Sequence, residues 1–458
     1  MMYDVAHRIE IKPKKKQLGY FYQSFGCSRL AYNWALHRMI EDFTVYRTAR
    51  ESAEERGVPM TGEERALRPD VLKLKKEFNA LKVKEFPFVY EVSKYVTQQP
   101  FIELGRAFSN FFRRLKAGEK PGFPRYKRKH SGEDSFYIGG DQIQLSDYDP
   151  TNKDERQKCT SAKRQFVKIP NLGWVKMQER LRFNGKVRSA TFSRSGSRLF
   201  VSFQVQIDEA EMVRTHPYLA EKPVGESIAI DAGLKSKGTL STGEHIENER
   251  PLKILLKKIK KVQRQMSRCV YPKTKADRDN GVKPSNHFLQ LARKLGDLMR
   301  RVTNIRTDSL QKLTTVLVRN FDAIVIEDLN LKGMVKNHRL AGAISDTAIG
   351  RMFQMLEYKS GWKGTRVIKV DRFYPSSKTC SCCGNVKKEL KLSERIYRCE
   401  KCGMVLDRDY NASLNLLNWA HEKMGVGHSF KPLDCQILRQ CLDTNRIRYK
   451  VAEDRKPH

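Results

Sequence analysis

The sequence predicts a multidomain protein that combines α/β and α+β parts. Three observations lead to this fold class: strand-like segments dominate residues 135–208, apolar strands alternate with helices after residue 225, and two Cys-x-x-Cys pairs interrupt that second region. Strands that alternate with helices are typical of an α/β domain, whereas successive short strands separated by turns are typical of an antiparallel sheet or barrel. A chain of 458 residues has room for two or three such domains.

The N-terminal region predicts one strand followed by helices. Residues 5–12 alternate apolar and polar side chains, as a strand does, and residues 16–116 have a helical pattern. Within residues 101–115, aromatic and leucine side chains recur every three or four positions, which predicts an amphipathic helix that ends at Gly118. We expect these apolar side chains to lie in a core.

A basic loop follows this helix at residues 120–129. Its Lys, Arg, Phe and Tyr side chains, interrupted by Pro and Gly, suit contact with a phosphate backbone and with a base or sugar face. A merely solvated loop would have a similar composition. The predicted nucleic-acid-binding residues are Arg113, Arg114, Lys120, Arg125, Tyr126, Lys127, Arg128 and Lys129.

Residues 135–208 predict a small antiparallel barrel. Alternating segments are separated by turn signals such as Asn184-Gly185 and Ser195-Gly196. We expect the first strand of the chain to help close this barrel. Residues 211–224 then have the composition of a linker.

The C-terminal half has the alternation of an α/β domain. Short apolar strands are predicted at residues 227–231, 323–327 and 366–371, and two long basic helices at about 251–268 and 286–320. The cysteine pairs form an insert after the third strand. Residues 426–458 are expected to be a tail, in which the sequence gives no clear signal.

The charge of the chain indicates its partners. Lys and Arg number 88 against 52 Asp and Glu, which gives a net charge of +36. Such an excess favours a polyanion, most commonly nucleic acid. We find no apolar run long enough to span a membrane, no secretory signal, and no convincing lipidation signal or amphipathic basic helix of the membrane-surface kind, so no membrane partner is expected. Sparse cysteines favour a reducing compartment, and we expect a cytoplasmic protein.

Three acids occupy related positions. Asp231 and Glu327 each end an apolar strand, and Asp409 opens a predicted helix. Each alone could be a strand-end or capping residue, but gathered at one end of a sheet they would repel each other unless divalent cations were bound. Oxygen ligands select Mg²⁺ or Mn²⁺, and two such ions can stabilise the attacking and leaving oxygens of a phosphodiester. We therefore predict Asp231, Glu327 and Asp409 as catalytic ligands of two Mg²⁺ (or Mn²⁺) ions.

The cysteine pairs are a strong signal by themselves. Cys380 and Cys383 are separated by fifteen residues from Cys399 and Cys402, a spacing typical of zinc sites. Four thiolates close a tetrahedral site and leave no position for water, so the Zn²⁺ would be structural. Cys382 lies inside the first pair, but the x-x spacing favours Cys383 as the ligand. Walker A, His-Glu-x-x-His and dinucleotide-binding signatures are absent from the sequence.

These residues and motifs give the chain a resemblance to a known family. It resembles the TnpB (OrfB) family of transposon-encoded RNA-guided nucleases and the related compact type V CRISPR effectors. The specific matches, in order, are Ile230-Asp-Ala-Gly-Leu, Ile326-Glu-Asp-Leu-Asn, the cysteine ribbon and Asp407-Arg-Asp-Tyr-Asn-Ala. Weaker matches, Gly26-Cys-Ser-Arg-Leu-Ala-Tyr-Asn-Trp and Gly122-Phe-Pro-Arg-Tyr-Lys, lie in the N-terminal part.

The resemblance implies a particular domain organisation. It implies an RNase H-like (RuvC) nuclease domain with Asp231, Glu327 and Asp409 as metal ligands, a zinc-ribbon insert, an N-terminal wedge-like β-barrel and a helical recognition domain. The expected ranges are 1–15 and 130–210 for the barrel, 16–129 for the recognition domain, 211–224 for the linker, 225–371 and 404–425 for the nuclease domain, 372–403 for the ribbon and 426–458 for the tail.

The resemblance also implies an activity: RNA-guided, Mg²⁺-dependent cleavage of DNA next to a short flanking motif, through a single RuvC-like site. The implied partners are a guide RNA, derived from a transposon end or a CRISPR array, and double-stranded target DNA; the protein would be prokaryotic, and nucleoid-associated when it is bound to DNA. Two alternatives remain open. One is a guide-RNA-dependent DNA-binding protein that represses or targets without cleavage, and the other is an RNase H-like transposase. Fold-level analogy does not separate these three functions.

Overall fold

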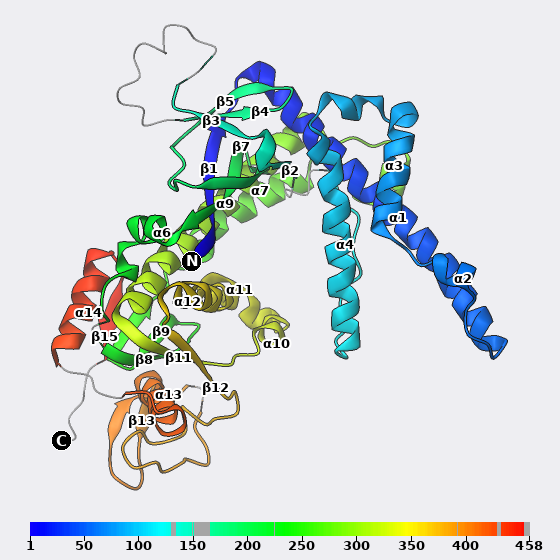
Figure 1. Ribbon diagram of the computed structural model, residues 1–458. Coiled ribbons are helices and arrows are strands. Elements are labelled where there is room, and N and C mark those ends of the chain that lie inside the picture. Colours follow the sequence, from blue (N-terminus) through cyan, green and yellow to red (C-terminus); the bar gives the residue numbers. More distant parts are fainter. Residues whose placement is uncertain are drawn as a thin grey trace. The chain divides into compact units, whose positions relative to one another are not determined.

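The computed structural model describes residues 1–129, 134–148, 150, 165–223, 225–391, 393–427 and 432–452. The chain forms two compact units, Met1–Thr215 and His216–His458 (Figure 1). Each unit has its own hydrophobic core. In the described part of the chain, no helix combines the length and apolar character needed to cross a membrane.

The helices of the first unit are α1 (Leu18–Glu55), α2 (Gly62–Ala66), α3 (Val71–Glu85), α4 (Lys94–Lys116) and, after the sheet, α6 (Glu209–Thr215). Of these, α1, α3 and α4 pack around an aromatic core. Phe101, Leu104 and Phe108 of α4 are buried there, which confirms the predicted core face. Leu115 is 53% exposed, so the prediction is wrong for the last turn of the helix. That turn reaches beyond the side chains of α1 and α3 that make up this core.

The first unit also contains a seven-stranded antiparallel sheet. Its order is β2-β6-β7-β1-β5-β4-β3. The strands are β1 (Met2–Lys12), β2 (Ser135–Gly139), β3 (Gln144–Ser146), β4 (Phe166–Ile169), β5 (Gly173–Met177), β6 (Lys186–Ser195) and β7 (Arg198–Asp208). The first strand joins this sheet, as predicted, between β7 and β5. The predicted barrel is not seen, because no pairing among the described residues connects the outer strands β2 and β3.

The second unit is built on a six-stranded mixed sheet, and the predicted strands before Asp231, Glu327 and the ribbon are confirmed. Its order is β12-β11-β8-β9-β10-β15. The strands are β8 (Gly225–Asp231), β9 (Ser236–Leu240), β10 (Glu244–Glu247), β11 (Phe321–Glu327), β12 (Arg366–Val370) and β15 (Tyr449–Val451). β8, β11 and β12 run parallel to one another, whereas β9, β10 and β15 join by antiparallel pairing. Parallel strands place their carboxyl ends at one edge of a sheet.

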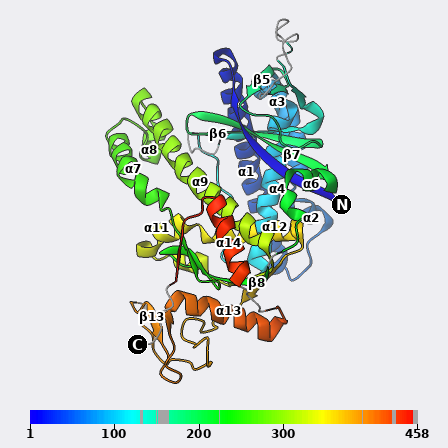
Figure 2. The same cartoon turned by 90° about the vertical axis from the view of Figure 1, so that its left-hand side faces the viewer.

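The helices of this unit are α7 (Pro251–Ser267), α8 (Lys275–Asp279), α9 (Asn286–Asn320), α10 (Leu331–Val335), α11 (His338–Thr347), α12 (Ile349–Lys363), α13 (Arg408–Met424) and α14 (Pro432–Thr444). Some of them cover the two faces of the sheet (Figure 2). One core forms where α9, α12 and α14 pack on the sheet, and another where α13 covers the opposite face. The two long helices predicted at about 251–268 and 286–320 are confirmed as α7 and α9.

The C-terminal segment differs from the expected featureless tail. Its described residues, 432–452, form α14 and β15, and Leu438, Leu442 and Ile447 are buried in the core of the second unit. A strand of three residues has too little periodicity to be recognised in a sequence. The segment is therefore part of the folded unit.

Candidate active site and metal centre

Asp231 and Glu327 end two neighbouring parallel strands. β8 and β11 pair in register from Phe321 opposite Gly225 to Ile326 opposite Ile230, so the next two residues, Glu327 and Asp231, lie at the same edge. The apolar residues before them are buried in the sheet. The sequence thus places both carboxyl groups at the carboxyl ends of the strands, where sites form in open α/β sheets.

Asp409 approaches the same edge from α13. The Asp407 carboxylate accepts hydrogen bonds from the backbone N–H groups of Asp409 and Tyr410 at 2.9 and 3.0 Å, and so caps the helix. The helix is anchored by Leu416, Leu417 and Ala420, which pack on the sheet. This cap and core fix Asp409 in the first turn of the helix.

The three acids interact electrostatically. Burial, followed by the charges of Glu327 and Asp409, raises the pKa of Asp231 well above its usual range. Burial also raises the pKa of Glu327, and the opposing effect comes from the Ser376 hydroxyl, which donates to its Oε1 at 2.9 Å. Carboxyl groups held together in this way resist ionisation unless a cation offsets their charge. The structure therefore places the three predicted residues near enough for Glu327 and Asp409 to act electrostatically on Asp231.

A cavity of about 360 Å³ is lined by one of the three acids, Asp409. Asp407 and Asp409 form part of its wall, and Arg395 lies 3.9 Å from the Asp409 carboxylate. The remaining lining residues come mostly from the sheet side: Lys235, Ser236, His245, Glu247, Asn248, Arg250 and Lys450. The cavity thus has an acidic wall and several cationic groups at the same opening.

The four predicted cysteines form one cluster. The ligand atoms of Cys380, Cys383, Cys399 and Cys402 all lie within 4.8 Å of one another. The sulfur atoms of Cys380 and Cys402 are 3.6 Å apart, and those of Cys383 and Cys399 are 3.5 Å apart. A tetrahedral zinc site with Zn–S bonds of about 2.3 Å has sulfur–sulfur distances of about 3.8 Å, so the geometry fits Zn²⁺. Cys382 is exposed and outside the cluster.

The thiols also differ in acidity. Burial raises the pKa of Cys380 to about 12, whereas the Cys402 backbone N–H is the main cause that lowers the pKa of Cys399 to about 6. Zinc binds cysteine in the thiolate form. The low pKa of Cys399 favours that form at neutral pH, whereas Cys380 would lose its proton only when zinc binds. The two-stranded ribbon β13 (Ile396–Arg398) and β14 (Val405–Asp407) carries the second cysteine pair and leads directly into α13.

Two buried asparagines connect the ribbon to α13, and sequence reasoning missed them. The Asn411 side chain donates to the Thr379 carbonyl at 2.7 Å and accepts from the Ser381 N–H at 3.0 Å. The Asn415 side chain donates to the carbonyls of Ser376 and Thr379. Their i, i+4 spacing on an otherwise apolar helix face was the available signal. The ribbon is thus fixed to the helix that carries Asp409.

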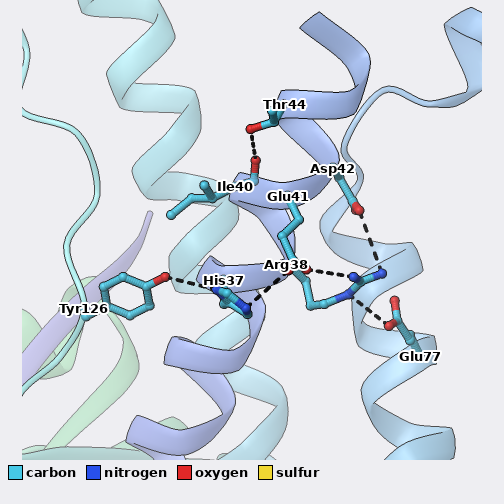
Figure 3. Close-up of polar contacts among 8 residues, drawn as sticks. All are labelled: His37, Arg38, Ile40, Glu41, Asp42, Thr44, Glu77 and Tyr126. Atoms are coloured by element: carbon cyan, nitrogen blue, oxygen red, sulfur yellow. Dashed lines mark hydrogen bonds and ion pairs between the residues drawn. The ribbon is translucent and has the colours of Figure 1, made fainter. Parts of the chain in front are cut away.

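The predicted nucleic-acid-binding residues lie in the first unit, and two of them are held against α1. The Asn33 side chain pairs with the backbone N–H and carbonyl of Lys127 at 2.8 and 2.9 Å, and the Lys127 ammonium lies 2.7 Å from Glu103. The Tyr126 hydroxyl is 3.5 Å from His37 Nδ1 (Figure 3).

Two of the other predicted residues, Arg113 and Arg114, have polar partners within the protein. Arg114 is paired with Glu119, and Arg113 donates to Asn110. Six side chains of the predicted set are exposed: Arg113, Lys120, Arg125, Tyr126, Arg128 and Lys129. Their role in binding nucleic acid stays a prediction.

Three family models match the chain. One described as "Probable transposase", of the OrfB type, matches residues 202–338, and a "Cas12f1-like, TNB domain" matches residues 350–416. A third, described as "Helix-turn-helix domain", matches residues 1–44. In this structure residues 1–44 contain the strand β1 and most of α1, so the description does not fit the local fold.

The chain is also similar to curated proteins and to a solved structure. A Streptomyces pristinaespiralis protein named "Putative RNA-guided DNA endonuclease" is 31% identical over 93% of this chain and 92% of its own length. "TnpB-like protein L79" of Acanthamoeba polyphaga mimivirus is 32% identical over 44% of this chain and 39% of its own length. A Cas12f1 complex with single-guide RNA and target DNA aligns with a TM-score of 0.41 at 14% identity, covering 91% of this chain and 98% of that one.

Proposed function

The chain belongs to the TnpB (OrfB) family, and from this premise we propose that it is an RNA-guided DNA endonuclease with one nuclease site at Asp231, Glu327 and Asp409. The observation that supports the proposal is the electrostatic interaction among these acids: burial and the charges of Glu327 and Asp409 raise the pKa of Asp231, and burial raises the pKa of Glu327. The full-length relative named as an RNA-guided DNA endonuclease supports the same activity.

The three acids hold Mg²⁺ or Mn²⁺ in this proposal. Two such ions, when bound, would stabilise the attacking oxygen of a water molecule and the leaving oxygen of the phosphodiester. Water would add to phosphorus as the P–O3′ bond breaks, leaving a 5′-phosphate and a 3′-hydroxyl. The Ser376 hydroxyl orients the Glu327 carboxylate, and the Asp407 cap fixes Asp409. The Zn²⁺ held by Cys380, Cys383, Cys399 and Cys402 has a structural role, because it folds the insert that leads to Asp409.

The partners follow from charge and from the family. A net charge of +36 favours binding of the guide RNA and of double-stranded target DNA. The exposed lysines of α7, opposite its buried Leu255, Ile259 and Val262, are available to an A-form backbone. In this scheme base pairing reads the target, and protein reads the flanking motif and duplex shape. In this proposal the sheet of the first unit corresponds to the wedge domain, and helices α1–α4 correspond to the recognition domain. The second unit corresponds to the RNase H-like (RuvC) nuclease domain.

Cleavage of a matched plasmid tests the proposal. The protein is purified with its RNA, the RNA is sequenced, and plasmids with the matching target and a library of flanking motifs are incubated with Mg²⁺. Asp231→Ala should abolish cutting and keep RNA binding. Asp322→Ala is the matched control, since Asp322 is an exposed acid near the opposite end of the same strand as Glu327.

Two outcomes would redirect the assignment. Target binding without cutting across the whole motif library would favour the guide-dependent binder. Strand-transfer products formed without RNA would favour the transposase, which the description of one matching family model names. If Asp231→Ala still cut DNA, the three acids would not be the nuclease site.

A further inference from the structure

A row of polar side chains crosses four strands of the second unit, starting at Asp231. Asp231 of β8 lies opposite Thr239 of β9, Thr239 lies opposite His245 of β10, and His245 lies opposite Lys450 of β15. Residues directly opposite each other in neighbouring antiparallel strands project to the same face of a sheet. The row therefore runs on one face from the candidate nuclease acid to the edge strand of the C-terminal segment.

The middle of this row is connected to the helix that carries Asp409. The Thr239 hydroxyl and His245 Nδ1 are 2.8 Å apart, and His245 Nε2 lies 3.7 Å from the Asp407 carboxylate. Asp407 in turn caps α13 through the backbone N–H of Asp409. The imidazole is thus held by Thr239 at Nδ1 and lies near Asp407 at Nε2.

Lys450 stands at the opening of the site. It lines the cavity that contains Asp407 and Asp409, together with Arg250 and Arg395. The side chain is exposed, and among the described residues no ion pair or hydrogen bond of its ammonium group is found. Arg395, by contrast, lies near the Asp409 carboxylate, and Arg250 donates to the Lys235 carbonyl. Of these three cations, Lys450 has its charge most available to a ligand.

The position of Lys450 is set by the fold of the C-terminal segment. β15 pairs with β10 over Glu244, His245 and Ile246. α14 is held beneath by Leu438 and Leu442 in the core and by the ion pair between Arg439 and the fully buried Glu244, at 2.7 Å. A lysine on a mobile tail would have no fixed relation to the acids, whereas this one is in the same sheet.

We propose that Lys450 binds a backbone phosphate of the nucleic-acid strand next to the bond that is cut, and so positions that strand over Asp231, Glu327 and Asp409. A lysine ammonium group can bind a backbone phosphate as a point charge. The inference rests on the proposed nuclease function and adds a positioning residue from outside the matched family ranges.

The competing explanation is that Lys450 only protects an edge strand. Lysines are common on such strands because they discourage pairing with another chain. A protective lysine predicts no effect of its removal on the rate of cutting, whereas a phosphate ligand predicts a slower cut with target binding unchanged. Lys450→Arg keeps the positive charge, so under either explanation it should behave much like the wild type.

The first experiment measures single-turnover cutting of the matched plasmid by the RNA-loaded protein. Lys450→Ala should lower the rate about tenfold, the effect of losing one charge-assisted hydrogen bond, and Lys450→Arg should restore most of it. Target binding, measured in the Asp231→Ala background, should change less than about twofold, because the guide duplex dominates it. The control is Lys369→Ala, a half-exposed lysine on β12 at the other edge of the sheet, paired with Glu357. A Lys450→Ala rate equal to that of the wild type overturns the proposal while the nuclease function stands.

A second experiment tests the phosphate contact of Lys450 by measuring binding rather than cleavage. Its result is therefore informative even if the wild-type protein does not cut DNA. Binding of a fluorescent single-stranded oligonucleotide to the full chain is measured over a range of salt concentrations. Loss of one phosphate contact should reduce the slope of log K against log salt by about 0.7 in Lys450→Ala and not in Lys369→Ala. Equal slopes in the two variants would overturn the phosphate contact.

Discussion

Asp231 and Glu327 adjoin at the carboxyl ends of two parallel strands, and the charge of Glu327 is, after burial, the largest cause of the raised pKa of Asp231. The fold therefore keeps together two groups that oppose each other's ionisation. Such an arrangement costs stability in the absence of a cation and is relieved when one binds. Stability measurements on the purified protein thus report on the site without any nucleic acid.

The first prediction concerns Asp231→Asn. Because the folded chain holds the Asp231 proton more tightly than the unfolded chain does, stability falls as pH rises above the ordinary Asp range. Asparagine does not titrate, so the variant should be more stable than the wild type at pH 8 by at least about 1 kcal/mol, with a smaller gain at pH 5. Urea unfolding in magnesium-free buffer without chelator, which leaves the zinc in place, measures both differences.

The same pair of proteins tests the metal. Mg²⁺ should raise the melting temperature of the wild type by mass action and have little effect on Asp231→Asn. An equal Mg²⁺ effect in both proteins would place the ion elsewhere. A wild type that is the more stable protein at pH 8 would contradict the repulsion.

The second prediction concerns the ribbon. Cys399→Ser removes one of four ligands and should lower bound zinc from about one ion per chain to a small fraction of that, because structural zinc sites need all four ligands. Cys382→Ser is the matched control, since Cys382 is in the same loop but outside the cluster. Metal analysis of the two purified variants gives the answer, and zinc loss in Cys382→Ser would show that the wrong cysteine was assigned.

The elements that the sequence predicted well have strong local patterns. The apolar runs before Asp231 and Glu327 identify buried strands, and the spacing of Cys380 and Cys383 identifies metal ligands, without knowledge of any distant contact. The missed features depend on partners far along the chain. Lys450 acquires its position only through pairing with His245, and Leu115 is exposed although it continues the helical repeat of buried side chains. Periodicity contains no information on such partners.

The third prediction concerns the C-terminal segment. Arg439→Ala leaves the fully buried carboxylate of Glu244 without its cation, which should cost about 2 kcal/mol, less than a fully buried pair because Arg439 itself is 39% exposed. The double variant Arg439→Leu with Glu244→Gln removes both charges and should recover most of that loss. Urea denaturation compares the three proteins. A loss below about 1 kcal/mol in Arg439→Ala would mean that the segment is not docked as described.

The fourth prediction uses Lys359, a lysine that is 3% exposed in the contact between α12 and α9. Its ammonium donates to the Gln311 carbonyl and to the hydroxyls of Thr314 and Thr315 at 2.7–2.8 Å, and no carboxylate is among these partners. Burial lowers its pKa to about 7. Between pH 7 and the ordinary lysine range the unfolded chain therefore binds more protons than the folded chain, so stability due to this group rises with pH.

Lys359→Met isolates this contribution from the rest of the titrating groups. The wild type should gain up to about 1.4 kcal/mol of unfolding free energy per pH unit relative to the variant between pH 7 and pH 9. Below pH 7 the group is charged in both states and the difference should become constant. Denaturation series at pH 6, 7, 8 and 9 measure it. Curves for the two proteins that stay parallel from pH 7 to pH 9 would mean that the three oxygen acceptors compensate the burial of the charge, and that Lys359 keeps its proton throughout.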